Sequence, residues 1–450
     1  MKQKNKVQVM TEGSPFLLII KFAIPLILSS FFQQLYNFAD TAIVGRCIGV
    51  DALSAVGVTG SLYSLILGFT MGGAIGFCIP LSQSVGAGKK EELNPYFWNG
   101  LYLSVGISLL VTIVITFFLG DILIFMKTPG NLLPMAKDYL TIIMLGQITT
   151  ILYNYFAAVL RALGDSKRPF YFLLIASGVN IILDLLFIIV FSMGVSGAAF
   201  ATVVSQVVSA GLCGWWLFQK MDVIQIEERE FSLLHMKKMA MIGIPMGLEH
   251  SVTYVGAIVL QGAINSLGSV AVAAQVCGEK IRRMITLPFE GVGSAMATYA
   301  GQNYGAGRTD RIKKGINSGL MIQAGYGILA FMVIGILKKP MVSLLLGETV
   351  SSEAQMAMEY LTIIIPLCLF HGFMMVFRNV LQGMGHGVSA LFSGGVEVAG
   401  RVTASIMAVS RNSFTMIALA NPMAWCLAMC YCMVLDVYFI RKENRKVSQN

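Results

Sequence analysis

Two aspartates stand alone in long apolar stretches of the sequence. Asp40 is the only charged residue in the range 22–45, and Asp184 is the only one in the range 169–219. A charged side chain at the centre of a membrane-spanning helix costs about 2.5–3.5 kcal/mol, so acids in such places commonly bind protons or ions. The two carboxyls are therefore candidates for the binding and release of a cation.

Two neutral polar residues, Asn180 and Thr202, are predicted to join the aspartates. Asn180 precedes Asp184 by one helical turn and shares its face. At 1.5 Å per residue, Asp40, Thr202 and Asp184 lie about 8, 10 and 12 Å from the outer ends of their predicted helices. We expect these residues to meet in an outward-facing cavity. Two carboxyls, an amide and a hydroxyl suit a bound proton or a Na⁺ ion, and the alternative is that Asp184 only hydrogen-bonds Asn180 or a neighbouring helix.

Twelve apolar segments can position these residues. Of the 450 residues 56% are apolar and 12% are charged, about half of the roughly 25% charged residues of a soluble protein. The segments lack the alternation of a membrane β-barrel, and the first is too long for a signal peptide. We predict an all-α integral membrane protein with spans near residues 15–45, 52–79, 94–119, 136–160, 170–192, 195–218, 236–266, 270–300, 314–337, 355–380, 389–409 and 415–440.

The basic residues predict the orientation of these spans. With the amino terminus inside, the inner loops hold 21 Lys and Arg, Arg378 among them, and the outer loops hold six. This asymmetry follows the positive-inside rule and predicts a multi-pass protein of the cell inner (plasma) membrane with both termini in the cytoplasm. The net charge of +9 then requires no nucleic acid as a partner. The eight cysteines show no metal-binding or redox spacing and are expected to pack within the helices.

A phrase that occurs once in each half indicates an internal repeat. Residues 83–88 read QSVGAG, and residues 302–307 read QNYGAG, 219 positions later. We predict an N-terminal six-helix lobe over 1–218, a cytoplasmic linker over 219–238 and a C-terminal six-helix lobe over 239–450. Six spans in each half require a pseudo-two-fold axis along the membrane normal, an arrangement of transporters that bind substrate between two bundles.

Glycine and proline positions bear on packing and movement. Gly68, Gly72 and Gly76 recur every four residues in span two, a spacing that lets helices approach closely. Pro25 opens the core of span one, and Pro245 opens the corresponding span of the second half. Proline removes a backbone hydrogen bond, so Pro25 is a predicted bending point.

The intramembrane acids of the second half, unlike Asp40 and Asp184, have basic residues nearby in the sequence. Glu279 precedes Arg283 by four residues and Glu397 precedes Arg401 by four, so each pair can neutralise itself on one helix face. By the repeat offset, Arg401 occupies the counterpart of Asn180, which argues against a second cation site of the same design. A charge network of spans eight and eleven that holds the helices together is expected there. The second half offers four acids and four bases for it: Glu249, Glu279, Glu290, Glu397, Lys280, Arg282, Arg283 and Arg401.

Three motifs and the repeat resemble one family of transporters. The motifs are the two QxxGAG phrases, RALGD-x-x-x-P over 161–169, and Ala-Asn-Pro over 420–422. Over roughly residues 15–440 the chain is similar to multidrug and toxic compound extrusion (MATE) transporters. The resemblance implies export of bulky, often cationic organic compounds by antiport with H⁺ or Na⁺, alternating access, and no cofactor beyond that ion. We expect it to work as a monomer.

The resemblance also implies roles for particular residues. In the DinF-like branch of the family, a span-one acid, a span-five Asn-x-x-x-Asp and a span-six Thr form the cation site. The matching residues are Asp40, Asn180, Asp184 and Thr202. A substrate cavity is expected near five further residues, in which Glu249 would attract a cationic substrate: Gln34, Tyr36, Asn154, Met246 and Glu249.

Other functions fit the sequence less well. A flippase for lipid-linked precursors or polysaccharides, from the related superfamily, would need a basic cavity, whereas the first half offers two acids. A membrane enzyme would need a nucleophile or metal constellation, and no HExxH, GxSxG or clustered His and Cys occurs. We therefore expect no catalytic residues and no resident metal site. A sensor would usually add a soluble domain, and an ion channel would need a symmetric pore loop.

Overall fold

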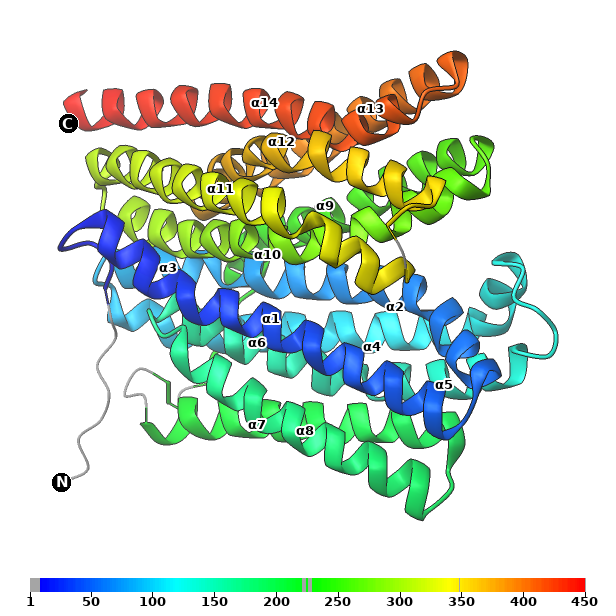
Figure 1. The fold of residues 1–450 in the computed structure, drawn as a ribbon. Helices are drawn as coiled ribbons and strands as arrows, with labels where there is room; N and C mark the ends of the chain where they lie inside the picture. The colour runs from blue at the N-terminus through cyan, green and yellow to red at the C-terminus, as the bar shows by residue number, and fades with distance from the viewer. Residues whose placement is uncertain (1–8, 221–223, 226–228, 348, 450) are drawn as a thin grey trace. The chain divides into compact units, whose positions relative to one another are not determined.

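The computed structural model describes residues 9–220, 224–225, 229–347 and 349–449. Within these ranges the chain is helical nearly throughout and contains no β-strand (Figure 1). Backbone polar groups cannot be left unpaired in a bilayer, and an α-helix pairs them within one segment. The all-α fold expected from the apolar segments is thereby confirmed for the described residues.

The first half of the chain forms helices that end at glycine-containing corners. They are α1 (Pro15–Cys47), α2 (Val50–Phe77), α3 (Ile79–Gly86), the 3₁₀ turn η1 (Lys90–Glu92), α4 (Leu93–Phe125), α5 (Leu133–Leu145), α6 (Gln147–Ala162), α7 (Lys167–Leu185), the π-helical turn η2 (Leu186–Val190) and α8 (Gly194–Lys220). The second half forms α9 (Leu233–Ser266), α10 (Ser269–Gly305), α11 (Thr309–Leu346), α12 (Ser352–Gly383), α13 (Gly387–Arg411) and α14 (Phe414–Gln449).

Each of the twelve predicted spans coincides with one of these helices or with a pair of them. Span two covers α2 and runs on into α3, and span four is divided between α5 and α6, which are bent by 46° at their junction. Eight helices of the described chain are long and apolar enough to cross a membrane, or nine if that bent pair is one span. The spans that fall below this threshold, α9, α10 and α13, carry the charged residues of the second half.

The described helices divide into two compact units whose limits lie inside helices. The first unit contains residues 28–247 and the second contains residues 10–27 and 248–449. The predicted lobes have their boundaries at residues 218 and 239 instead. The difference arises because the opening turns of α1 belong to the second unit and those of α9 belong to the first.

Close helix contacts in the first unit depend on glycine. A Cβ on Gly76 in α2 would lie 3.0 Å from the backbone nitrogen of Gly243 in α9 and 2.9 Å from the sulfur of Met246, and it would clash with the Gly243 Cα. The absence of a side chain therefore lets the two backbones meet, as the glycine spacing in span two predicts.

Gly76→Ala is expected to lower the stability of the protein. The added methyl group must push α2 away from α9, and overpacking of this kind costs about 1–3 kcal/mol. A fall in melting temperature in detergent, followed by size-exclusion chromatography of heated samples, measures the effect. Gly60→Ala is the matched control, because a Cβ on Gly60 in the same helix meets nothing within 4 Å. Equal melting temperatures for the two variants would contradict the close contact.

The second QxxGAG corner holds the segment that precedes α1. Gln302 Oε1 accepts the Met10 backbone N–H at 2.6 Å, and Asn303 Nδ2 donates to the Met10 carbonyl at 3.2 Å. Arg311 donates to the same carbonyl at 3.2 Å and to the Gly13 carbonyl at 3.0 Å. The motif thus supplies the side chains that hold an extended piece of backbone.

A related contact occurs in the first unit, beside the first QxxGAG corner. There α4 holds the segment that precedes α9: Asn99 Nδ2 donates to the Glu230 carbonyl at 3.0 Å, and Asn94 Oδ1 accepts the Gln225 N–H at 3.0 Å. Trp98 Nε1 adds a bond to the Gln225 carbonyl at 2.9 Å. The second unit therefore binds the segment that precedes α1, and the first unit binds the segment that precedes α9.

Arg311→Met is expected to release the segment before α1. Two charge-assisted hydrogen bonds are lost, and bonds of this kind contribute about 1.5–3 kcal/mol each. Hydrogen exchange of backbone amides in residues 10–14, followed by mass spectrometry, should become faster. Arg308→Met serves as the control, since Arg308 makes one such bond, to the Thr11 carbonyl at 3.2 Å. Unchanged exchange in the Arg311 variant would show that the segment is held by other contacts.

Candidate functional site

The four residues predicted to bind a cation lie on three helices of the first unit. Asp40 lies on α1 and is half-buried, whereas Asn180 and Asp184 lie on α7 and are fully buried. Thr202 lies on α8, which packs along α7, and is 6% exposed. Helical periodicity places Asn180 and Asp184 one turn apart on the inner face of α7.

The two carboxyls are neighbours in space. Asp40 and Asp184 interact electrostatically with each other through their side chains. No hydrogen-bond donor of the described residues reaches Asp40 Oδ1 or either carboxyl oxygen of Asp184. The amide oxygen and nitrogen of Asn180 are likewise buried and unpaired. Buried polar groups in proteins are nearly always paired, so a cluster of unpaired acceptors suits a ligand that brings positive charge.

Three tyrosines surround the acids. Tyr36, one turn before Asp40 on α1, lies close to the side chain of Thr202. Tyr63 on α2 lies close to Asp40, and Tyr139 on α5 lies close to both aspartates. The family resemblance suggests a substrate cavity for Tyr36, whereas neither Tyr63 nor Tyr139 is predicted to have a role. Both stand among other polar residues of their helices, so only the three-dimensional contact distinguishes them.

A π-helical turn directly follows Asp184. Residues 186–190 form η2, in which the backbone is wound more widely than in an α-helix. The Phe191 N–H bonds to the Leu186 carbonyl at 3.0 Å and the Met193 N–H to the Phe187 carbonyl at 2.9 Å. Such turns occur mostly at functional sites, because the extra residue changes which side chains face inward. The sequence pattern contains no sign of it.

The chemistry of this group is that of a cation acceptor. Within the described residues, neither Asp40 nor Asp184 is ion-paired with a basic side chain. Two adjacent carboxylates in a poorly solvated place repel each other, and binding one proton or one cation relieves the repulsion. Carboxylate, amide and hydroxyl oxygens are also ligands of hard cations such as Na⁺.

The second unit neutralises its buried charges internally. Arg378 on α12 donates to Glu249 on α9 at 2.8 Å and pairs with Glu397 on α13. Glu397 also pairs with Arg401 at 2.9 Å, as its sequence spacing predicts. Gln382 Nε2 donates a hydrogen bond to the second carboxylate oxygen of Glu249 at 2.8 Å. All these groups are at most 6% exposed. A buried charge network therefore exists, but it joins α9, α12 and α13 and not spans eight and eleven, between which it was predicted.

One further prediction about these charges is wrong. Arg378 does not lie in a cytoplasmic loop, where the orientation count places it, but inside α12 between two acids. The predicted Glu279–Arg283 pair is present at 3.5 Å, and Arg282 is the closer partner of Glu279. The Arg378–Glu249 pair was not accessible from spacing, since it joins residues 129 positions apart.

The five residues expected near a substrate cavity remain a prediction, and they belong to both units: Glu249 lies in the second and the other four lie in the first. Gln34, Tyr36 and Asn154 lie in the first unit on α1 and α6. Met246 is buried in a small apolar cluster with Ile79 and Ile242. The negative charge of Glu249 is already balanced by Arg378, which leaves no free charge for a cationic substrate.

Three features define a membrane transporter. Helices match the twelve predicted spans, the sequence repeats in two six-span halves, and two acids have no basic partner in the described part of the chain. The chain belongs to the MatE family, whose profile matches residues 25–186 and 245–399. It is 32% identical over 309 residues to the Probable multidrug resistance protein YpnP of Bacillus subtilis (strain 168), covering 67% of this chain and 68% of that protein. It is 26% identical over 335 residues to the Probable multidrug resistance protein NorM of Thermotoga maritima, covering 70% and 69%.

Solved structures of the family share the fold. One, described as the outward-facing conformation of a multidrug resistance MATE family transporter of the MOP superfamily, aligns with a TM-score of 0.91 at 22% identity. The alignment covers 98% of this chain and 99% of that one. These matches confirm the resemblance read from the motifs, the fold of two six-helix bundles, and a transporter rather than an enzyme.

Proposed function

We propose that the protein exports bulky organic cations in exchange for inward flow of H⁺ or Na⁺. Membership of the MatE family and the relatives named for multidrug resistance support the substrate class. The observation that carries the coupling is the pair of neighbouring carboxyls, Asp40 and Asp184, which have no basic partner among the described residues. Placing an acid pair inside a membrane costs free energy, so such pairs are found mainly where they bind a proton or an ion.

In this proposal the coupling ion is bound between α1 and α7. A proton held between Asp40 and Asp184 would remove one negative charge, and Tyr36 and Thr202 would orient the neighbouring oxygens. With Na⁺ as the ion, the carboxylates, the Asn180 amide oxygen and the Thr202 hydroxyl would be the ligands. Binding from outside and release inside would drive alternating access, in which the bending of α1 near Pro25 accompanies substrate release.

The charge asymmetry of the loops supports a membrane location and an orientation for the protein. We propose a multi-pass protein of the plasma membrane with both termini in the cytoplasm, acting as a monomer. The candidate cation site then lies toward the outer face, where protons or Na⁺ arrive. The substrates would be organic compounds with apolar bodies, since flat aromatic rings and flexible methionines suit guests of variable shape.

Ethidium uptake into inverted membrane vesicles tests the function and names the ion. The vesicle lumen corresponds to the outside of the cell, so a lumen more acidic than the medium, or richer in Na⁺, should drive ethidium inward. Each gradient is imposed separately, and vesicles without the protein give the background. The gradient that drives uptake identifies the coupling ion. If neither gradient raises uptake above background, antiport of organic cations is wrong.

A further inference from the structure

A stripe of small polar residues runs along one face of α4 in the first unit. Ser104, Ser108 and Thr112 follow one another at four-residue intervals, so their side chains lie one helical turn apart on the same face. Ser104 is 2% exposed and Ser108 is fully buried, and neither hydroxyl has a hydrogen-bond partner among the described residues. Buried hydroxyls in proteins are nearly always paired, so these two indicate a partner other than a protein side chain.

The stripe leads to the bend in span four. Thr112 Oγ1 donates to the carbonyl of Met144, in the last turn of α5, at 3.0 Å. Helix α6 begins three residues later at Gln147, which is fully buried and whose Oε1 also has no hydrogen-bond partner in the described part of the chain. Gln147 Nε2 lies 3.5 Å from Thr70 Oγ1 on α2. Unpaired oxygens of α4 and α6 therefore lie close to the bend, with a hydroxyl of α2 beside Gln147.

A small cavity adjoins these groups. Ser104 of α4 and Thr70 of α2 line it, and its apolar walls include Phe77, Ile107 and Ile151 together with part of α9. Its volume is about 10 Å³, close to the roughly 10–15 Å³ that one water molecule requires. A pocket for an organic ligand is far larger, about 300–1,000 Å³. The cavity can therefore hold one water molecule and is too small for a substrate.

The unpaired groups match a neutral ligand that both donates and accepts hydrogen bonds. Gln147 Oε1 can only accept, whereas the hydroxyls of Ser104 and Ser108 can donate or accept. A buried water molecule typically makes about three hydrogen bonds, and these groups offer one each. Among the described residues that line the cavity none is charged, which argues against an ion, because an unpaired charge in an apolar interior is strongly disfavoured.

We propose that this cavity binds a resident water molecule, which links α4 to α6 at the bend of span four. In this arrangement the water donates to Gln147 Oε1, accepts from Ser104 and makes its third hydrogen bond with Ser108. A bend within a membrane is tolerated where the polar groups beside it find partners, and the water supplies part of that pairing. The inference does not rest on the proposed function, because neither the two aspartates nor a substrate takes part.

Radiolytic footprinting of the purified full-length transporter in detergent tests the proposal. Brief X-ray irradiation converts bound water into hydroxyl radicals, which oxidise adjacent side chains even where bulk solvent does not reach, and mass spectrometry locates the oxidised residues. Phe77 lines the cavity and is 3% exposed. It should be oxidised several-fold faster than Phe97, which is fully buried and lies outside the cavity lining.

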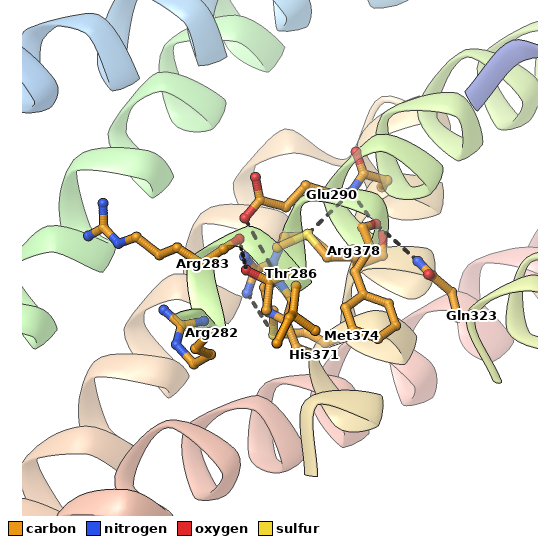
Figure 2. A network of polar contacts seen from close by, with 12 residues as sticks. Arg282, Arg283, Thr286, Glu290, Gln323, His371, Met374 and Arg378 are labelled. Carbon is orange, nitrogen blue, oxygen red and sulfur yellow. Dashed lines mark hydrogen bonds and ion pairs between the residues drawn. The ribbon is translucent and has the colours of Figure 1, made fainter. Parts of the chain in front are cut away.

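Ser104→Val distinguishes a bound water from incidental access of solvent. Its two methyl groups occupy the cavity and remove a hydrogen-bond partner, so the oxidation of Phe77 should fall to the rate of Phe97. Ser104→Ala removes the hydroxyl without adding volume and should change the rate in the same direction if the valine variant does not fold. Thr286→Val is the control, because the buried Thr286 hydroxyl already donates to the Arg283 carbonyl at 3.1 Å (Figure 2).

A double-mutant cycle tests the link between the two helices. Ser104 and Gln147 share no direct hydrogen bond in the described part of the chain. The shifts in melting temperature of Ser104→Ala and Gln147→Met should therefore add unless something joins the two side chains. With a water between them, the second substitution should cost less once the first is present, so the double variant should melt above the temperature that the summed shifts predict.

Three results would overturn the proposal. They are oxidation of Phe77 in the wild type at no more than the rate of Phe97, oxidation of Phe77 that neither change at Ser104 lowers, and additive shifts in the cycle. Thr286→Val should leave the oxidation of Phe77 unchanged, and a loss there would show that the effect is not specific to the cavity. None of these results bears on the ethidium test, and failure of ethidium uptake would leave the water site in place.

Discussion

Asp184→Asn is expected to abolish gradient-driven ethidium uptake in inverted vesicles while the protein remains folded. Asparagine has nearly the shape of aspartic acid but can neither release a proton nor contribute a negative charge to a bound Na⁺. One titratable carboxyl then remains in place of two, so a proton or Na⁺ can no longer be held between a pair of acids and coupling to the gradient should be lost. Uptake should fall to the level of vesicles without the transporter, and Asp40→Asn should have the same effect.

Stability measurements separate this role from a structural one. The wild-type protein buries two neighbouring carboxyls without donors, so removing one charge should leave the melting temperature in detergent unchanged or raise it. Asp121→Asn is the matched control, since Asp121 is an exposed acid on α4, and it should transport normally. A large loss of stability in Asp184→Asn would favour the alternative that Asp184 mainly supports its neighbouring helices. Full uptake in both aspartate variants would rule out this cation site.

Arg378→Gln is expected to destabilise the second unit more than any other single substitution in its charge network. Arg378 is 4% exposed and joins Glu249 and Glu397. Its removal leaves two buried carboxylates with Arg401 alone to balance them, and an uncompensated buried charge costs about 3–5 kcal/mol. The variant should be recovered in low yield and should melt at a clearly lower temperature in detergent.

A double-mutant cycle shows whether charge balance is the cause. Arg378→Gln/Glu249→Gln removes one charge of each sign and leaves the Glu397–Arg401 pair intact, so it should be more stable than Arg378→Gln alone. Arg283→Gln is the control, because the Arg283 side chain is 71% exposed and makes one contact of 3.5 Å. If Arg378→Gln matched the wild type in melting temperature, the network would have no structural importance.

The fold was predictable from the sequence because a bilayer imposes a simple rule. A chain crosses it as a helix of about 20 predominantly apolar residues. The twelve apolar segments are helices at nearly the predicted places. The glycine spacing in span two also predicted a real contact, between Gly76 and Gly243. The breaks within spans two and four were not predicted, since apolar composition says nothing about where a helix bends.

The cation site was predictable in part, for a different reason. Lone acids in apolar segments are conspicuous, and depth along a helix is simple arithmetic, so Asp40, Asp184 and Thr202 could be grouped. Spacing along one helix likewise predicted the Glu397–Arg401 pair. Contacts between distant segments give no such signal, and for this reason Arg378, Gln147 and the tyrosines beside the aspartates became functional candidates only in three dimensions.

The division of the described chain into two units has a mechanical consequence. The described chain passes from one unit to the other inside two helices, at residues 27/28 of α1 and 247/248 of α9. Each crossing lies two or three residues after a proline, Pro25 or Pro245. Any rotation of one unit against the other must be taken up by the covalent chain at these crossings. Proline lacks the N–H that would complete a backbone hydrogen bond there. We therefore expect α1 and α9 to bend near these prolines if the units rotate.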